Sequence, residues 1–219
     1  MIGLKRLAGG LLLSLLYSLL CLGANGSVAA DVAKSFLPPG SRMVQLEKYD
    51  PKTGKVTGSE PAAIACHILS PESDDIIFAY ETPEGDAHNK VLFVDLLHKS
   101  EQRYVKLQEL SYYGEHLWTQ DFATIGLKLI HPPESRTDAV AVMTGIGAAL
   151  GGQLQVFKWD PDFGLRDVMP ENGSVKKFYF TQEKNGVRIR LSFERYPGDR
   201  EAPAAIIYLW DGKNASKVS

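Results

Sequence analysis

The chain has 219 residues and a formal net charge of −2, and its acidic and basic residues are interspersed. A mildly acidic chain offers no electrostatic footprint for nucleic acid or for an anionic membrane surface, so we expect neither as a partner. The length suits a single domain that is large enough to bury a real hydrophobic core.

The first thirty residues have the three-part pattern of a secretory signal. A basic pair at residues 5–6 precedes an apolar run over residues 7–22, and small residues then lead to cleavage motifs that end at Ala29 and Ala30. The run is shorter than the roughly 20 apolar residues that a membrane span needs. We therefore predict that residues 1–30 are a signal peptide and that no stable membrane span remains after cleavage.

Both cysteines bear on the compartment. Removing the signal leaves Cys66 alone, so the exported chain has no internal disulfide and must be held together by its core. Cys66 lies in the strand-like run AAIACHIL, where we expect a small buried hydrophobe rather than a reactive thiol. A periplasmic or secreted location follows from the signal. The alternative is a lipid anchor at Cys21, although Leu20 is large where such anchors carry a small residue.

Short β-rich runs, separated by loops rich in Pro, Gly, Asn and Asp, follow one another through residues 31–219, which we predict to be a single domain. They fall into three units, at about residues 62–110, 123–169 and 175–218, each with three or four strands. A repeat of roughly fifty residues with this content suggests the blades of a β-propeller. The expected strands are residues 76–80, 91–97, 104–110, 139–143, 154–159, 178–181, 187–193 and 206–210.

Two stretches near the end of the chain resemble each other. LQVFKWDPDFG at Leu154–Gly164 and AIIYLWDGKNA at Ala205–Ala215 both end an apolar run in Trp-Asp and a turn. The run VLFVDLL at Val91–Leu97 is apolar on both faces, as expected for a blade between two neighbours, whereas Val187–Phe193 alternates and predicts one solvated side for the last unit. Three units are too few to close a ring. The prediction is therefore an all-β fold of antiparallel blades in a partial propeller-like array, with an open β-sandwich as the alternative.

The two Trp-Asp stretches, together with ILSPESDDIIFAY and LIHPPESRTDAVAVM, resemble repeats of the FG-GAP or VCBS type in exported bacterial proteins. Those repeats are related to the blades of the integrin α-chain propeller. The resemblance implies an acidic turn that holds Ca²⁺ in many members. The matching turns here lack the alternating acids and the glycine, so a plain solvated turn is the favoured interpretation and no cofactor is required. The weak candidate ligands are Glu72, Asp74, Asp75, Glu134 and Asp138.

Other motifs give little chemistry. The glycine-rich stretch Thr144–Gly152 precedes a strand rather than a helix, which favours a hairpin loop over a dinucleotide site. No histidine pair has the i, i+4 spacing of a zinc site, and no Gly-x-Ser-x-Gly elbow is present. Among the histidines, His88 lies beside acidic residues in a loop and is the first to check for a ligand.

Three aromatic residues form the remaining candidate site. If Trp118 is exposed together with Tyr112 and Tyr113, they make a patch that stacks on a sugar or anchors a partner. The sequence favours a non-catalytic binding or scaffold module of the bacterial envelope or secreted fraction, with an unknown protein or carbohydrate as its partner. The alternative is an extracytoplasmic hydrolase with an unidentified active site.

Overall fold

The computed structural model describes residues 28–50, 53, 55–83, 90–113, 124–132, 135–145, 152–170, 175–193 and 205–218. They form one short helix over residues 28–34 and fifteen strands that pair antiparallel, which confirms the predicted all-β class. The strands are β1 (Arg42–Met43), β2 (Gln45–Tyr49), β3 (Val56–Pro61), β4 (Ala63–Cys66), β5 (Asp75–Pro83), β6 (Lys90–Ser100), β7 (Arg103–Tyr113), β8 (Thr124–Ile130), β9 (Ala139–Gly145), β10 (Gly152–Asp160), β11 (Gly164–Asp167), β12 (Val175–Glu183), β13 (Gly186–Phe193), β14 (Ala205–Trp210) and β15 (Ala215–Lys217).

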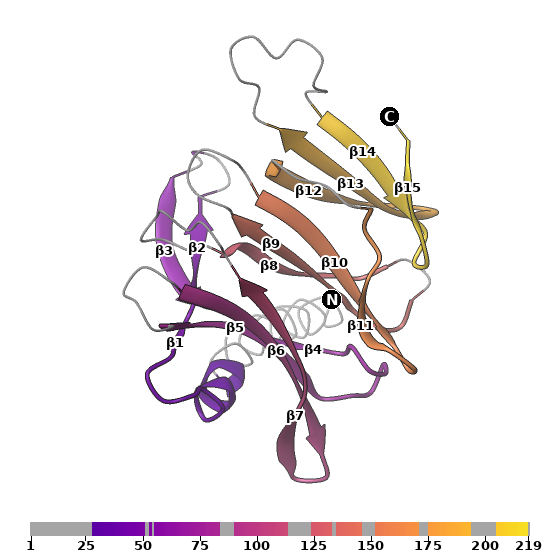
Figure 1. Ribbon diagram of the computed structural model, residues 1–219. Coiled ribbons are helices and arrows are strands. Elements are labelled where there is room, and N and C mark those ends of the chain that lie inside the picture. The colour runs from indigo at the N-terminus through magenta and orange to yellow at the C-terminus, as the bar shows by residue number, and fades with distance from the viewer. Residues whose placement is uncertain are drawn as a thin grey trace, which may run out of the picture.

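Three four-stranded meanders, in which each strand pairs with the next along the chain, make up most of the molecule (Figure 1). The first blade is β4 to β7, the second is β8 to β11, and the third is β12 to β15. The second and third blades join into one sheet through a single residue pair, Gly152 with Val175. Along the described strands neither large sheet closes on itself, so the array is open, as the count of three units requires.

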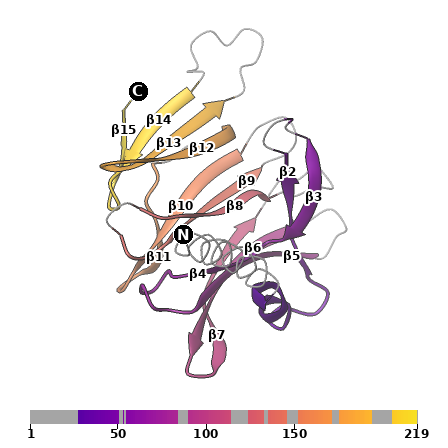
Figure 2. The ribbon, with the colours of Figure 1, turned by 180° about the vertical axis from the view of Figure 1, so that it is seen from behind.

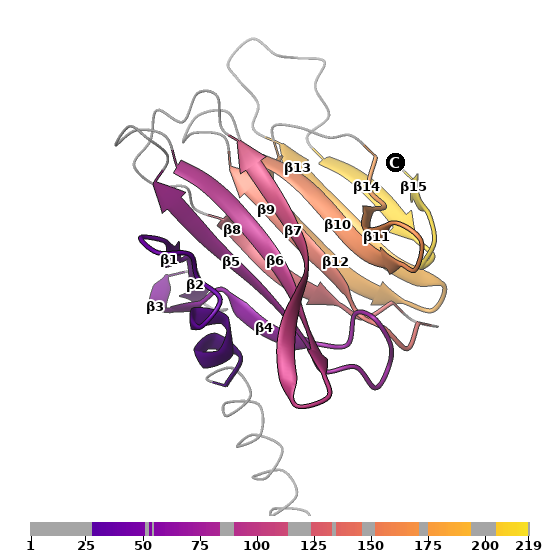
Figure 3. The same ribbon diagram turned by 60° about the horizontal axis from the view of Figure 1, so that its bottom comes forward.

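The second blade is buried on both faces because it lies between the other two (Figure 3). Val140 and Val142 of β9 contact the core shared with the first blade, while Ala139, Ala141 and Met143 contact the core shared with the third. All five side chains have no solvent exposure. The continuous apolar sequence of β9 is thus explained, because a strand with a wet face would alternate.

The two Trp-Asp stretches occupy equivalent places in successive blades. Trp159 lies one residue before the end of β10, and Trp210 ends β14, each the third strand of its blade. Trp159 packs half-buried on the core between the first and second blades, and Trp210 is fully buried between the second and third. The following Asp160 and Asp211 each accept two backbone N–H groups of the turn into the fourth strand. In each Trp-Asp stretch, the tryptophan therefore packs between blades and the aspartate caps the turn that follows.

The short helix over residues 28–34 covers the outer face of the first blade (Figure 3). Its Ala29, Ala30 and Ala33 are buried against that blade, where Phe78 and Tyr80 of β5 form part of the same cluster. Small alanine side chains let the helix approach the sheet closely. None of the helices in the described ranges is both long and apolar enough to cross a membrane.

Within the described ranges, no helix covers the outer face of the third blade. In β13, Val187, Ile189 and Leu191 are buried toward the second blade, whereas Arg188 and Arg190 point outward. This alternation agrees with the solvated side expected from the sequence. Gly186 opens the strand where a β-carbon would lie 2.3 Å from the carbonyl oxygen of Trp210, so the turn before β13 requires glycine.

A separate hairpin of β2 and β3 stands on the opposite side of the molecule from β14 and β15 (Figures 1 and 2). Its residues are mostly exposed, and Leu46 packs against the core between the first two blades. Val44 leads into the hairpin, donates its backbone N–H to the carbonyl of Ala79 in β5 and accepts the backbone N–H of Ala62 at its own carbonyl. The hairpin is therefore tied to the first blade at its base.

Candidate functional site

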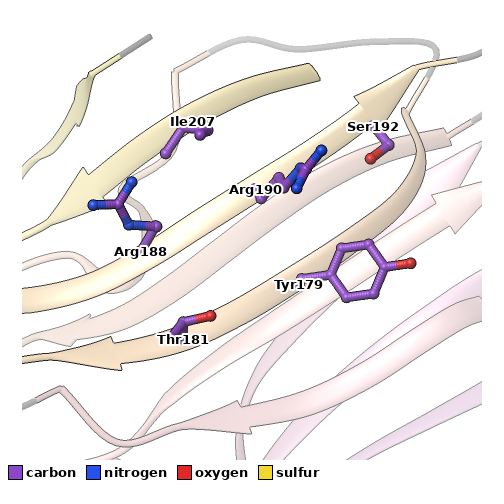
Figure 4. A pocket seen from close by; sticks show the side chains of 6 residues that line it. All are labelled: Tyr179, Thr181, Arg188, Arg190, Ser192 and Ile207. Carbon is purple, nitrogen blue, oxygen red and sulfur yellow. The ribbon is translucent and has the colours of Figure 1, made fainter. Parts of the chain in front are cut away.

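The outer face of the third blade carries a shallow hollow of about 620 Å³ (Figure 4). We call this surface the open face and define it by the residues that line the hollow. They come from three adjacent strands, β12, β13 and β14, and alternate with residues buried in the core on the other side of the sheet. The open face consists of Tyr179, Thr181, Arg188, Arg190, Ser192 and Ile207.

The register places an arginine beside an aromatic ring on this surface. Arg190 pairs with Tyr179 on one side and with Ile207 on the other, so the three side chains form a row across the strands. Directly opposite residues on one face of a sheet are close neighbours. Tyr179 keeps 54% of its surface exposed, and Arg190 is also exposed. The row combines a planar cation with a flat apolar ring.

The two arginines of the open face differ in their partners. Arg188 Nε is hydrogen-bonded to Glu183, and this bond raises the pKa of the Arg188 guanidinium. Arg190 makes no ion pair with any residue in the described ranges. The positive charge of Arg188 is therefore largely compensated, whereas that of Arg190 is available to an incoming anion.

A second hollow, of about 400 Å³, lies where the β10–β11 and β14–β15 turns approach each other. Lys158 crosses between the blades and donates from Nζ to the carbonyl oxygen of Gly212 at 2.8 Å. Asp167 is occupied as well, because its Oδ1 accepts the backbone N–H groups of Val156 and Met169. Lys158 thus joins the second blade to the third, while Asp167 caps backbone groups within the second.

Asp75, one of the predicted metal ligands, is the centre of a buried hydrogen-bond network. Its Oδ2 accepts the backbone N–H groups of Ile68 and Leu69 at 2.8 and 2.9 Å and the hydroxyl of Ser73 at 2.5 Å. Its Oδ1 lies 2.8 Å from Nδ1 of His98. Because the hydroxyl of Ser73 donates to the carboxylate and not to the imidazole, these residues are not arranged as a nucleophilic triad.

Asp138, another predicted ligand, repeats this arrangement in the second blade. It is buried directly before β9, its Oδ2 accepts the N–H of His67 at 2.8 Å, and its own N–H donates to the carbonyl of His67. Nδ1 of His131 lies 2.5 Å from its Oδ1. Asp138 therefore locks the end of β4 in the first blade to the start of β9 in the second.

The remaining candidate ligands lie apart from these two. Asp74 is exposed and pairs with Lys99, with 2.9 Å between Oδ2 and Nζ. Glu72 is exposed in the same loop, and Glu134 lies outside the described residues. Across the described ranges, no three His, Cys, Asp or Glu side chains are grouped in a way that would hold a metal ion.

Only part of the predicted aromatic patch falls within the described residues. Tyr112 of β7 packs against the core between the first two blades, and burial raises the pKa of its hydroxyl. Trp118 and the side chain of Tyr113 lie outside the described residues, so the patch stays a prediction. The same holds for His88 and for residues 146–151 of the glycine-rich stretch.

Asp95 of β6 is a charged residue whose burial the sequence did not indicate. It is fully buried on the face of the first blade that bears Phe78 and Tyr80, and burial raises the pKa of its carboxyl to about 6. Lys106 Nζ lies 3.1 Å from Oδ2, yet neither oxygen accepts a well-aligned hydrogen bond from the described part of the chain. The same lysine pairs more closely with Glu109, at 2.6 Å.

Comparisons with protein-family models, with curated proteins and with solved structures found no match.

Sequence reasoning singled out turns and loops and passed over the open face. The signal was present, because Arg188, Arg190 and Ser192 alternate with apolar residues in β13. What the sequence lacked was the pairing of Arg190 with Tyr179, which depends on the register between β12 and β13. Two residues eleven positions apart in the chain become neighbours only through that hairpin.

Proposed function

We propose that this chain is an exported, non-catalytic binding or scaffold module of the bacterial cell envelope or secreted fraction, similar to FG-GAP and VCBS repeat proteins, and that it binds through the open face. The observation that carries the proposal is the asymmetry of the array. One terminal blade is covered by the segment after the predicted cleavage site, where Ala33, Phe36 and Leu37 pack on it, whereas the other presents to solvent an aromatic ring and an arginine that has no ion pair within the described residues. A surface of that composition suits reversible binding.

The distribution of perturbed acids supports a non-catalytic role over the alternative of a hydrolase. A hydrolytic site combines a cleft with a carboxyl or imidazole whose pKa is shifted toward its task. Asp95, the described carboxyl with a clearly raised pKa, is fully buried and lines neither hollow. The open face contains no carboxyl, imidazole or thiol.

Retention from an extract tests the binding role. The purified chain is immobilised and incubated with a cell-envelope extract of the producing cell, in parallel with a Tyr179→Ser/Arg190→Glu variant. A matched control carries Arg103→Glu, which reverses an exposed charge on β7 of the first blade. We expect the wild-type chain and the control to retain the same component and the open-face variant to lose it. Equal retention by all three would exclude the open face as the binding surface.

Export is tested by the mass of the mature protein. The signal predicts a chain that begins at Ala30 or at Asp31 and is recovered outside the cytoplasm. Cleavage after Ala30 would remove two of the three buried alanines of the helix, leaving Ala33 with Phe36 to cover the first blade. An intact chain recovered only from the cytoplasm would contradict export.

A further inference from the structure

The open face has a composition unlike that of the faces buried between blades. The buried faces are almost wholly apolar, built of aliphatic residues with a few aromatic ones such as Phe157 and Trp210, and in the described ranges they carry no arginine. The open face instead presents two arginines, two hydroxyls, one tyrosine and one isoleucine. Covering it with another apolar blade would strip water from the guanidinium of Arg190 without supplying a counter-charge, which is strongly unfavourable.

A second copy of the chain is also a poor occupant. Two open faces packed against each other would bring Arg190 of one copy toward the same positive face of the other. Like charges at an interface are repulsive, and Arg188 already uses Glu183 as its partner. The face therefore favours a ligand that is negatively charged and that leaves the arginines partly hydrated.

The arrangement of the row matches the groups of an acidic sugar. A guanidinium recognises a carboxylate through two parallel hydrogen bonds. The ring of Tyr179, next to Arg190 on the adjacent strand, offers a flat apolar surface against which a sugar ring stacks. Thr181 and Ser192 add outward hydroxyls able to hydrogen-bond sugar hydroxyls. A flat face of a β-sheet also suits an extended chain better than a compact ligand.

We propose that the open face binds an acidic polysaccharide, with Arg190 pairing with a uronate carboxylate and Tyr179 stacking on the sugar that carries it. This inference rests on the proposed function, because it identifies the ligand class of the same surface. The ligand must therefore have both a carboxylate and a sugar ring. A neutral polysaccharide lacks the partner of Arg190, and an acidic polypeptide lacks the ring that stacks on Tyr179.

Titration calorimetry at low salt tests the ligand class with three probes: polygalacturonate, its methyl-esterified form and polyglutamate. We expect the wild-type chain to bind polygalacturonate, to bind the ester at least about tenfold more weakly and to bind polyglutamate at least about tenfold more weakly. Added salt should weaken the binding, because the charges are exposed. Equal binding of the ester would show that the carboxylate is not recognised. Equal binding of polyglutamate would show that only charge is recognised. Either result overturns the proposal.

Variants assign the binding to the row. Arg190→Gln and Tyr179→Leu should each weaken polygalacturonate binding by about tenfold or more, whereas Arg103→Gln, the matched loss of an exposed arginine from β7, should not. Unchanged binding in both open-face variants overturns the proposal. If the wild-type chain binds no probe, while the open face still determines what is retained from an envelope extract, the polysaccharide assignment fails and the binding role stands.

Discussion

Burial of Asp95 predicts an unusual dependence of stability on pH. In the folded chain the pKa of Asp95 is about 6, whereas an exposed aspartate has a value of 3.8. Each pKa unit of difference corresponds to about 1.4 kcal/mol, so ionising this side chain destabilises the fold by about 3 kcal/mol relative to its protonated form. The folded state binds the proton more tightly than the unfolded state. Stability is therefore greatest below the unfolded pKa and falls as pH rises through the folded value.

Asp95→Asn removes this titration while keeping the shape of the side chain. Urea unfolding of both proteins, followed by tryptophan fluorescence between about pH 4 and about pH 7.5, gives the difference in free energy of unfolding at each pH. We expect that difference to move in favour of the variant by about 2.5 kcal/mol over this range, because a small part of the full change lies below pH 4. The polar amide adds an offset that is the same at every pH. Groups that titrate alike in both proteins contribute equally to both free energies of unfolding, so they do not affect the difference.

A second variant provides a control of opposite sign. Backbone N–H groups of Asn214 and Lys213 lower the pKa of Asp211, so its carboxylate stabilises the fold above the unfolded pKa, and this stabilisation is lost as pH falls. Asp211→Asn should therefore lose stability relative to wild type as pH rises from about 2.5 to about 4, so its unfolding is also measured in that acid range, whereas Asp95→Asn gains stability mainly above about pH 4. If the Asp95→Asn difference is the same at both ends of the pH range, burial does not perturb this carboxyl and the reasoning is refuted.

Three further predictions concern packing. Trp210→Ala should lower the free energy of unfolding by about 3–5 kcal/mol, and Trp159→Ala by clearly less because that ring is half-buried; equal losses in denaturant titrations would contradict the packing scheme. Cys66, buried with a raised pKa, should resist an aromatic disulfide reagent until denaturant is added, and immediate reaction in the folded state would contradict its burial. Gly186→Ala should lower the melting temperature markedly, because the new methyl group meets the carbonyl of Trp210, and an unchanged transition would refute that close approach.

The all-β class and the stacking of blades follow from local patterns in the sequence. In β9 each successive apolar residue turns to a different core, and a run without polar positions is what a strand between two sheets must show. In β13 the alternation of Arg188 and Arg190 with Val187 and Ile189 marks a strand with one wet face. Both patterns repeat every two residues, as side chains along a strand do, so they can be recognised without knowing which strands pair with β9 and β13.

Long-range pairing was harder to predict. Asp75 and Asp138 lie at turns that resemble metal-binding loops. In the fold, however, backbone N–H groups of residues 67–69 donate hydrogen bonds to both carboxylates. Asp95 interrupts an apolar run without any sign of its burial, because its surroundings come from β5 and β7. The hydrogen-bond partners of a carboxylate depend on how distant segments meet, and no local period encodes that.

The two ends of the array solve the same problem in different ways, and the difference supports a binding role for the third blade. A terminal sheet must either be covered or present a face that water tolerates. The first blade is covered by the segment after the predicted cleavage site, where Ala33, Phe36 and Leu37 pack on it. The third blade ends in β15, a strand of only three residues, which offers little edge to a neighbouring chain. Arg190 further disfavours casual association of the open face. A face that resists pairing with other copies yet keeps an exposed ring and an arginine without an ion pair in the described residues can bind a ligand specifically.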